Sequence, residues 1–66
     1  MALTNYPVSS SAIARLDYDD ELEVCYVTFM QGQSYEIEGI PELEVARWAA
    51  DPSPGRYFNF RIRGMY

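Results

Sequence analysis

The chain contains no histidine and no lysine, and Cys25 is its only cysteine. Without histidine the usual general base near neutral pH is missing, and no serine has an evident base to activate it. A single cysteine excludes an internal disulfide bond and a zinc site built on cysteines. We therefore expect a protein without catalytic activity, cofactor or metal.

Long hydrophobic runs are also missing. The longest apolar-rich stretch, residues 22–30, is interrupted by Glu23 and has the length of a strand, not of a membrane span. No signal-peptide pattern is visible, so we expect a cytoplasmic protein. The 66 residues are expected to form one domain with a marginal core, which the many aromatic side chains help to fill.

Charge is distributed unevenly. The net charge is −5, but residues 1–50 hold nine acids and two arginines, whereas residues 51–66 hold three arginines and one acid. The overall acidity counts against a general polyanion binder, because phosphate contacts dominate nucleic-acid affinity. Every basic side chain is arginine, whose planar fork binds anions at two points and stacks on aromatic rings. An anion site is therefore expected in residues 51–66, unless the arginines simply pair with acids.

Alternating and β-branched residues predict three strands, at residues 12–18, 22–30 and 34–38. Residues 1–7 show no periodicity and are expected to be a loosely docked lead-in. The strand at 22–30 is apolar on both faces, with Tyr26 central to one of them. A helix on one side leaves the other face for a second copy of the protein, so we expect a homo-oligomer.

A helix is predicted from Pro41 to Ala50, with Asp51-Pro52 ending it. Ser53 is expected to cap a short helical segment that runs through Ile62. The predicted fold is α+β: a three-stranded antiparallel meander, one helix packed on a face, and a short C-terminal helical segment. Further aromatic and apolar residues are assigned to packing, namely Tyr35, Leu43, Trp48, Phe58 and Ile62.

The segment Ser53–Asn59 is the strongest candidate site. Pro54 and Gly55 predict a sharp turn, after which Arg56 and Asn59 present polar forks among flat aromatic rings. Arginine binds phosphate, an aromatic ring such as Tyr57 stacks on a base, and asparagine reads a base edge. The alternative is structural: the aromatics pin the C-terminus to the sheet, and Arg56 pairs with an acid.

The consecutive serines Ser9, Ser10 and Ser11 are a second candidate. Their hydroxyls and nearby backbone N–H groups could bind phosphate or ribose oxygens. The alternative is a polar loop that hydrogen-bonds to itself.

An ordered series of motifs resembles the KTSC domain family over about residues 7–66. These motifs are Val8–Ile13, Tyr18–Asp19, Gly39–Pro41 and Ser53–Asn59 with Ile62–Arg63. One departure is Tyr35-Glu36-Ile37, where the family usually has Tyr-x-Tyr. The resemblance implies a small α+β module without known enzymatic activity. Such domains occur at the C-terminus of some lysyl-tRNA synthetases and alone in bacteria and phages, and RNA binding has been suggested for the family.

We therefore expect a non-catalytic module that binds a nucleotide-like anion in a pocket between protomers. By analogy of size and site chemistry, it could be a phage protein that sequesters a cyclic nucleotide immune signal, acting as an anti-defence sponge in the host cytoplasm. The alternatives are a single-stranded RNA-binding module and a protein–protein interaction module. No membrane partner is expected. The predicted ligand-binding residues are Ser9, Ser10, Ser11, Arg56, Tyr57, Asn59 and Arg63.

Overall fold

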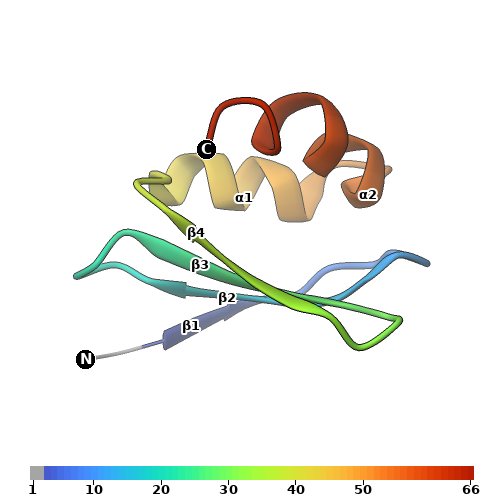
Figure 1. Ribbon diagram of the computed structural model, residues 1–66, viewed down its shortest axis with the longest axis horizontal. Helices are drawn as coiled ribbons and strands as arrows, with labels where there is room; N and C mark the ends of the chain where they lie inside the picture. The colour runs from blue at the N-terminus through green and yellow to red at the C-terminus, as the bar shows by residue number, and fades with distance from the viewer. Residues whose placement is uncertain (1–2) are drawn as a thin grey trace.

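A computed structural model describes residues 3–66 as two layers, an antiparallel sheet and helices on one of its faces (Figure 1). The strand order is β1-β2-β3-β4, so neighbours in the sheet are neighbours in the sequence. The strands are β1 (Leu3–Tyr6), β2 (Ile13–Asp19), β3 (Val24–Phe29) and β4 (Ser34–Glu38). The helices are α1 (Glu42–Ala50), the single turn α2 (Pro54–Tyr57) and the π-helical segment η1 (Phe58–Ile62). The predicted α+β class is confirmed.

The sheet has four strands, so the predicted three-stranded meander is wrong by one. β1 pairs antiparallel with β2 over four residue pairs, and the Asn5 side chain donates to the Leu16 carbonyl at 3.3 Å. The Tyr6 hydroxyl donates to the Glu42 carboxylate at the start of α1. The residues that pair with or bind β1 all lie far away in the sequence. Residues 3–6 therefore show no alternation of apolar and polar residues that would predict a strand. Residues 1 and 2 of the expected lead-in lie outside the described residues.

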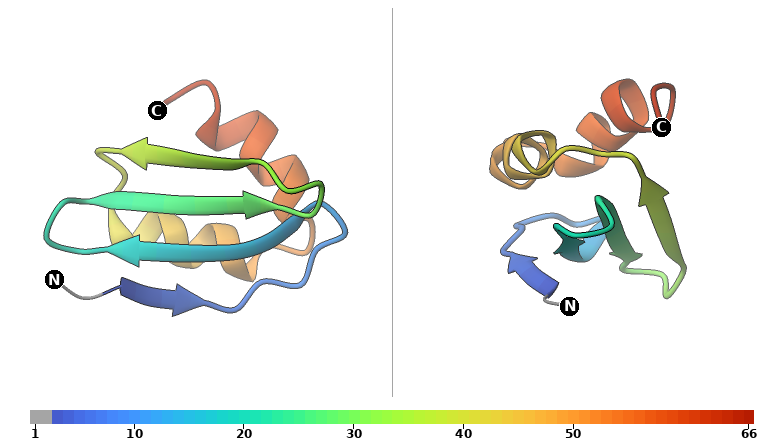
Figure 2. Two further views of the ribbon diagram at one scale, coloured as in Figure 1. Left: turned by 60° about the horizontal axis from the view of Figure 1, so that its bottom comes forward. Right: turned by 90° about the vertical axis from the view of Figure 1, so that its left-hand side faces the viewer.

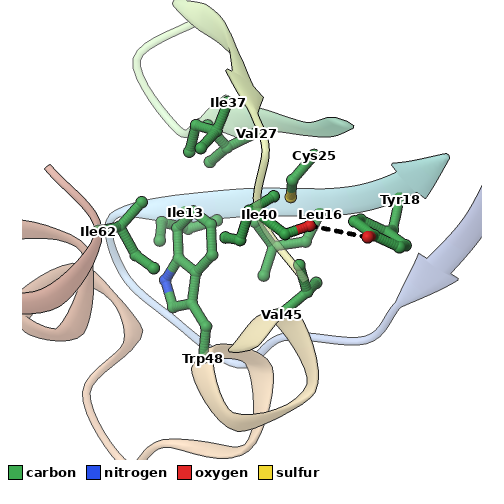
Figure 3. Packing of buried hydrophobic residues seen from close by; sticks show 10 residues of the cluster. All are labelled: Ile13, Leu16, Tyr18, Cys25, Val27, Ile37, Ile40, Val45, Trp48 and Ile62. Atoms are coloured by element: carbon green, nitrogen blue, oxygen red, sulfur yellow. Dashed lines mark hydrogen bonds between the residues drawn. The ribbon is translucent and has the colours of Figure 1, made fainter. Parts of the chain in front are cut away.

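The core lies between the inner face of the sheet and α1 (Figure 3). The central strands present alternate residues to this face, and the Tyr18 hydroxyl donates to the Ile40 carbonyl at 2.7 Å. This bond satisfies a polar group inside an otherwise apolar cluster. The core residues are Ile13, Leu16, Tyr18, Cys25, Val27, Ile37, Ile40, Val45, Trp48 and Ile62.

The outer face of the sheet has no helix on it (Figure 2). Tyr26 stands at its centre, half-buried, opposite Asp17 on β2 and Glu36 on β4. Val24 is largely buried even without a partner, whereas Leu22, in the turn before β3, is 63% exposed. The apolar centre of this face is therefore narrower than the sequence predicted, and it is bordered by acids.

Trp48 attaches the C-terminal helical segment to the core. Its indole N–H donates to the Pro54 carbonyl at 2.9 Å, and its ring stacks on Phe58 at 5.7 Å between centroids. Ile62, at 1% exposure, fills the end of the core. The expected packing roles of these residues are confirmed. Ser53 precedes α2 as predicted, but its side chain makes no capping bond.

One predicted packing residue is misplaced. Leu43 on α1 is 63% exposed, and the next residue, Glu44, is buried in its stead. The Glu44 carboxylate accepts hydrogen bonds from Tyr57 and Arg61 of the C-terminal segment, so a charged side chain can occupy an inward position of the helix. Tyr35 is 49% exposed, although its ring meets Phe29 edge-on at 5.6 Å.

Candidate functional site

A hollow of about 520 Å³ lies along the C-terminal helical segment and is called the arginine hollow below. It runs from the end of α1 over α2 to η1. Its lining residues are Asp51, Pro52, Ser53, Arg56, Tyr57, Phe60 and Arg61. The structure therefore brings two of the predicted site residues, Arg56 and Tyr57, into one concave surface.

Arg56 and Phe60 form the exposed part of the arginine hollow. The Arg56 guanidinium carbon lies 5.4 Å from the centre of the Phe60 ring, within the range of a cation–π contact. Phe60 is 73% exposed, and among residues 3–66 Arg56 makes no ion pair. The alternative in which Arg56 pairs with an acid is thus not realised in the described residues. Both a cation and an aromatic face are open to a ligand.

The rear wall of the hollow is held by Glu44, which is only 8% exposed. The Tyr57 hydroxyl donates to one carboxylate oxygen, and Arg61 Nη2 lies 3.4 Å from the other. The hydrogen bond from Tyr57, assisted by the charge of Arg61, holds the pKa of Glu44 below its usual value despite burial. Burial and the same hydrogen bond raise the pKa of Tyr57. The Tyr57 hydroxyl is therefore committed to Glu44, and only its ring is left for a ligand.

The serine loop lies near α2 but outside the arginine hollow. Ser10 Oγ accepts hydrogen bonds from the backbone N–H groups of Ala12 at 3.0 Å and Ile13 at 3.1 Å, while Ser9 and Ser11 are exposed. A Cβ placed on Gly55 would lie 3.1 Å from the Cβ of Ala12, so the loop passes directly beside the residue before Arg56. The Ser10 bonds correspond to the self-bonded loop, and a ligand role for the three serines stays a prediction.

The two remaining predicted site residues do not line the arginine hollow. Asn59 is exposed on η1 and lines neither hollow, and Arg63 lines a second hollow of about 430 Å³, called the aromatic hollow below. The ligand roles of both residues stay predictions. The lining residues of the aromatic hollow are Phe29, Gln31, Gln33, Tyr35, Glu36, Ile37, Phe58, Ile62, Arg63 and Tyr66.

Sequence reasoning missed the aromatic hollow because its walls come from two distant stretches of the chain. It also missed Arg61 and Glu44 as the support of Tyr57. The sequence carried no signal for this pair, because the helical pattern assigned Leu43 and not Glu44 to packing.

Three further properties limit what the described residues can do. Across residues 3–66, no three or more histidine, cysteine or acidic side chains are grouped so that they could hold a metal ion. The only thiol, Cys25, is fully buried, and burial raises its pKa to about 12. A thiol with so high a pKa is a poor nucleophile. In the described part of the chain, every helix is too short or too polar to cross a membrane.

Comparison with known proteins bears on the resemblance noted above. The sequence pattern of the KTSC domain matches residues 9–66. The crystal structure of a KTSC domain protein from Yersinia pestis is similar to this chain, with 31% identity and a TM-score of 0.85 over 97% of this chain and 90% of that one. Comparison with curated proteins gives no match. The extent of both matches shows that the chain belongs to the KTSC domain family.

Proposed function

We propose that the arginine hollow binds a small anionic ligand with a planar group, of the nucleotide type, and that it does so without turnover. The observation that carries the proposal is the Arg56 guanidinium, free of ion pairs within residues 3–66, beside the 73% exposed ring of Phe60. An exposed aromatic ring next to a free guanidinium supplies a stacking face and a phosphate ligand together.

Charge and size favour a compact ligand. Arg61 lines the same hollow and meets Glu44 through Nη2 at 3.4 Å, and its guanidinium carries further N–H donors. A volume of about 520 Å³ is typical of small-molecule sites. The net charge of −5 repels a long polyanion but disfavours two or three phosphates much less. Cyclic nucleotides combine bases with compact phosphates, and we propose them as the ligand class, with sequestration in a bacterial or phage-infected cell as the role.

Calorimetry with cyclic dinucleotides, mononucleotides and a short single-stranded RNA tests this proposal. Arg56→Ala should weaken binding about ten- to a hundredfold, the effect of losing a charge-assisted hydrogen bond. Arg47→Ala is the matched control, because Arg47 is an exposed arginine on α1 outside both hollows. Equal losses in both variants would mean unspecific attraction, and no binding by any ligand would refute the proposal.

The dependence of affinity on salt separates the alternatives. A compact ligand should show a shallow dependence, whereas RNA that neutralises several phosphates should show a steep one. Nucleotides incubated with the protein should be recovered intact. A hydrolysed product that disappears when Ser9, Ser10 and Ser11 are all replaced by alanine would overturn the non-catalytic assignment.

We also propose that the protein self-associates through the outer face of the sheet, around Tyr26. This face lies on the side of the sheet opposite the helical layer (Figure 1), so a dimer formed there does not by itself enclose the arginine hollow. Light scattering at micromolar concentration should show at least a dimer, and Tyr26→Asp should weaken it because an unpaired carboxylate would be buried. A stable monomer would exclude this interface while leaving ligand binding in the hollow untouched.

A further inference from the structure

The outer edge of β4 carries unpaired backbone groups. Within residues 3–66, β4 is the last strand of the sheet and pairs only with β3. At the end of the hairpin the Phe29 N–H donates to the Gln33 carbonyl at 2.8 Å, while the Phe29 carbonyl accepts from the Gly32 N–H at 2.9 Å, so Phe29 and Gln33 mark a hydrogen-bonding position of the ladder. Such positions alternate along an antiparallel ladder. Ser34, Glu36 and Glu38 therefore direct their N–H and C=O groups away from β3, and all three residues are exposed.

The aromatic hollow opens beside this edge. Tyr35 and Ile37 point from β4 toward the inner face, and the opposite wall comes from Phe58 and Arg63 of the C-terminal segment. Figure 2 shows this segment on the β4 side of the molecule, while α1 lies toward β1. The side chains of a strand added to β4 would alternate between the hollow and the outer face.

The charged residues around the β4 edge determine which side chains an added peptide strand can carry. Glu36 and Glu38 flank it on the outer face, so the outward side chains of an added strand should be basic. Arg63 and Glu36 both line the hollow, so their charges offset each other and apolar side chains are favoured there. On the outer face the charged residues of β4 are both acids, and this difference between the two faces fixes the register. A second copy of β4 would bring acids against acids, so self-pairing through this edge is disfavoured.

We propose that the β4 edge and the aromatic hollow form a docking site for an extended peptide in which basic residues alternate with apolar or aromatic ones. The peptide adds a fifth strand to the sheet, its basic side chains meet Glu36 and Glu38, and its apolar side chains enter the hollow. The site is independent of the arginine hollow, because the two hollows share no lining residue.

Synthetic peptides test the docking site. One peptide alternates lysine with phenylalanine or valine, a second has the same composition with the basic and apolar residues in separate blocks, and a third is the alternating peptide with N-methyl groups on the pairing amides. Fluorescence anisotropy should show binding of the first peptide and at least tenfold weaker binding of the other two, because strand addition requires both the alternation and the amide donors.

Variants of the full chain locate the site. Glu36→Lys should weaken binding of the alternating peptide about tenfold, whereas Asp20→Lys, the same charge change in the β2–β3 turn, should leave it within about twofold. Hydrogen exchange should show new protection of the Ser34, Glu36 and Glu38 amides on binding. Equal affinity for the block or N-methylated peptide would overturn the proposal. So would edge amides that become protected by raising the protein concentration alone, since the partner would then be a second copy.

Discussion

The two hollows of this small domain are built in different ways. The arginine hollow is formed by residues 51–61 alone, within one short helical stretch. The aromatic hollow joins residues 29–37 of the β3–β4 hairpin to residues 58–66 at the C-terminus. The first site is thus nearly a property of a local segment, whereas the second exists only when the chain is folded.

The two hollows also differ in how closely their lining residues are connected to the hydrophobic core. Arg56 and Phe60 of the arginine hollow project into solvent and carry no core packing. The aromatic hollow is backed by Ile37 and Ile62, which are 8% and 1% exposed and belong to the core. We therefore expect binding and stability to be separable at the arginine hollow and coupled at the aromatic hollow.

The largest effect is expected at Trp48, which holds the segment that forms part of both hollows. Trp48→Ala should destabilise the fold by about 3–5 kcal/mol, the usual cost of deleting a buried indole, and should unfold much of a chain this small. Trp48→Phe keeps most of the packing and should cost about 1–3 kcal/mol, because the Pro54 carbonyl loses its donor. Denaturant unfolding measures both. If the free energy of unfolding of Trp48→Ala equals that of the wild type, Trp48 does not anchor the C-terminal helical segment.

Substitutions at Gly55 test whether α2 contacts the loop that runs from Ser9 to Ala12. Gly55→Leu should destabilise the fold by about 1–3 kcal/mol, because its side chain would meet Ala12. Gly55→Ala should be near neutral, since the gain in helix propensity, about 1 kcal/mol, offsets a contact that is only slightly too close. Gly64→Leu is the control, because a Cβ at Gly64 meets nothing within 4 Å. Equal melting temperatures for the two leucine variants would rule out the contact.

Glu44 makes the support of the arginine hollow dependent on pH. Because the folded-state pKa of Glu44 lies below the unfolded value of 4.5, its stabilising contribution is complete above that pH and is lost as pH falls through the folded-state pKa. Glu44→Gln should therefore cost about 1–2 kcal/mol at neutral pH and less in acid. Thermal unfolding of both proteins from neutral pH to pH 3 measures the difference. A gap that stays constant over this range would contradict the assigned role of the carboxylate.

The smallest effect is expected at Ser10. Ser10→Ala should cost about 1 kcal/mol of stability, because two backbone N–H groups lose their acceptor and one of them can turn to water. Ser11→Ala should have no measurable effect on stability, since its exposed hydroxyl makes no hydrogen bond within residues 3–66. A larger loss in ligand affinity than in stability for Ser10→Ala would restore the predicted ligand role of the loop.

The sequence predicted the parts of the fold whose signal is local. Strand β4 was predicted at the observed residues from its alternation, and α1 within one residue from Pro41 and the Asp51-Pro52 stop. β1 was missed, because four residues without alternation become a strand only through β2 and the contact of Tyr6 with Glu42. Family resemblance correctly identified the KTSC domain over nearly the whole chain.

The candidate site likewise has a part that could be predicted from a local segment and parts that could not. The local segment from Ser53 to Asn59 was recognised from its composition, and the structure places Arg56 and Tyr57 of this segment in one hollow. The burial of Glu44 and the exposure of Leu43 could not be predicted, because a helical pattern gives the spacing of inward positions and not the partner that makes a charge acceptable there. The aromatic hollow depends on strand register and on the path of the C-terminus, neither of which is encoded in one segment.

The position of Cys25 makes the protein its own reporter of unfolding. The only thiol of the chain lies on the inner face of β3, between β2 and β4, with no exposed surface and a proton that is hard to remove. An alkylating reagent can modify it only after the sheet has separated from α1. The labelling rate, followed as a single mass increment, therefore measures how often this part of the core opens in the native protein, without any added probe.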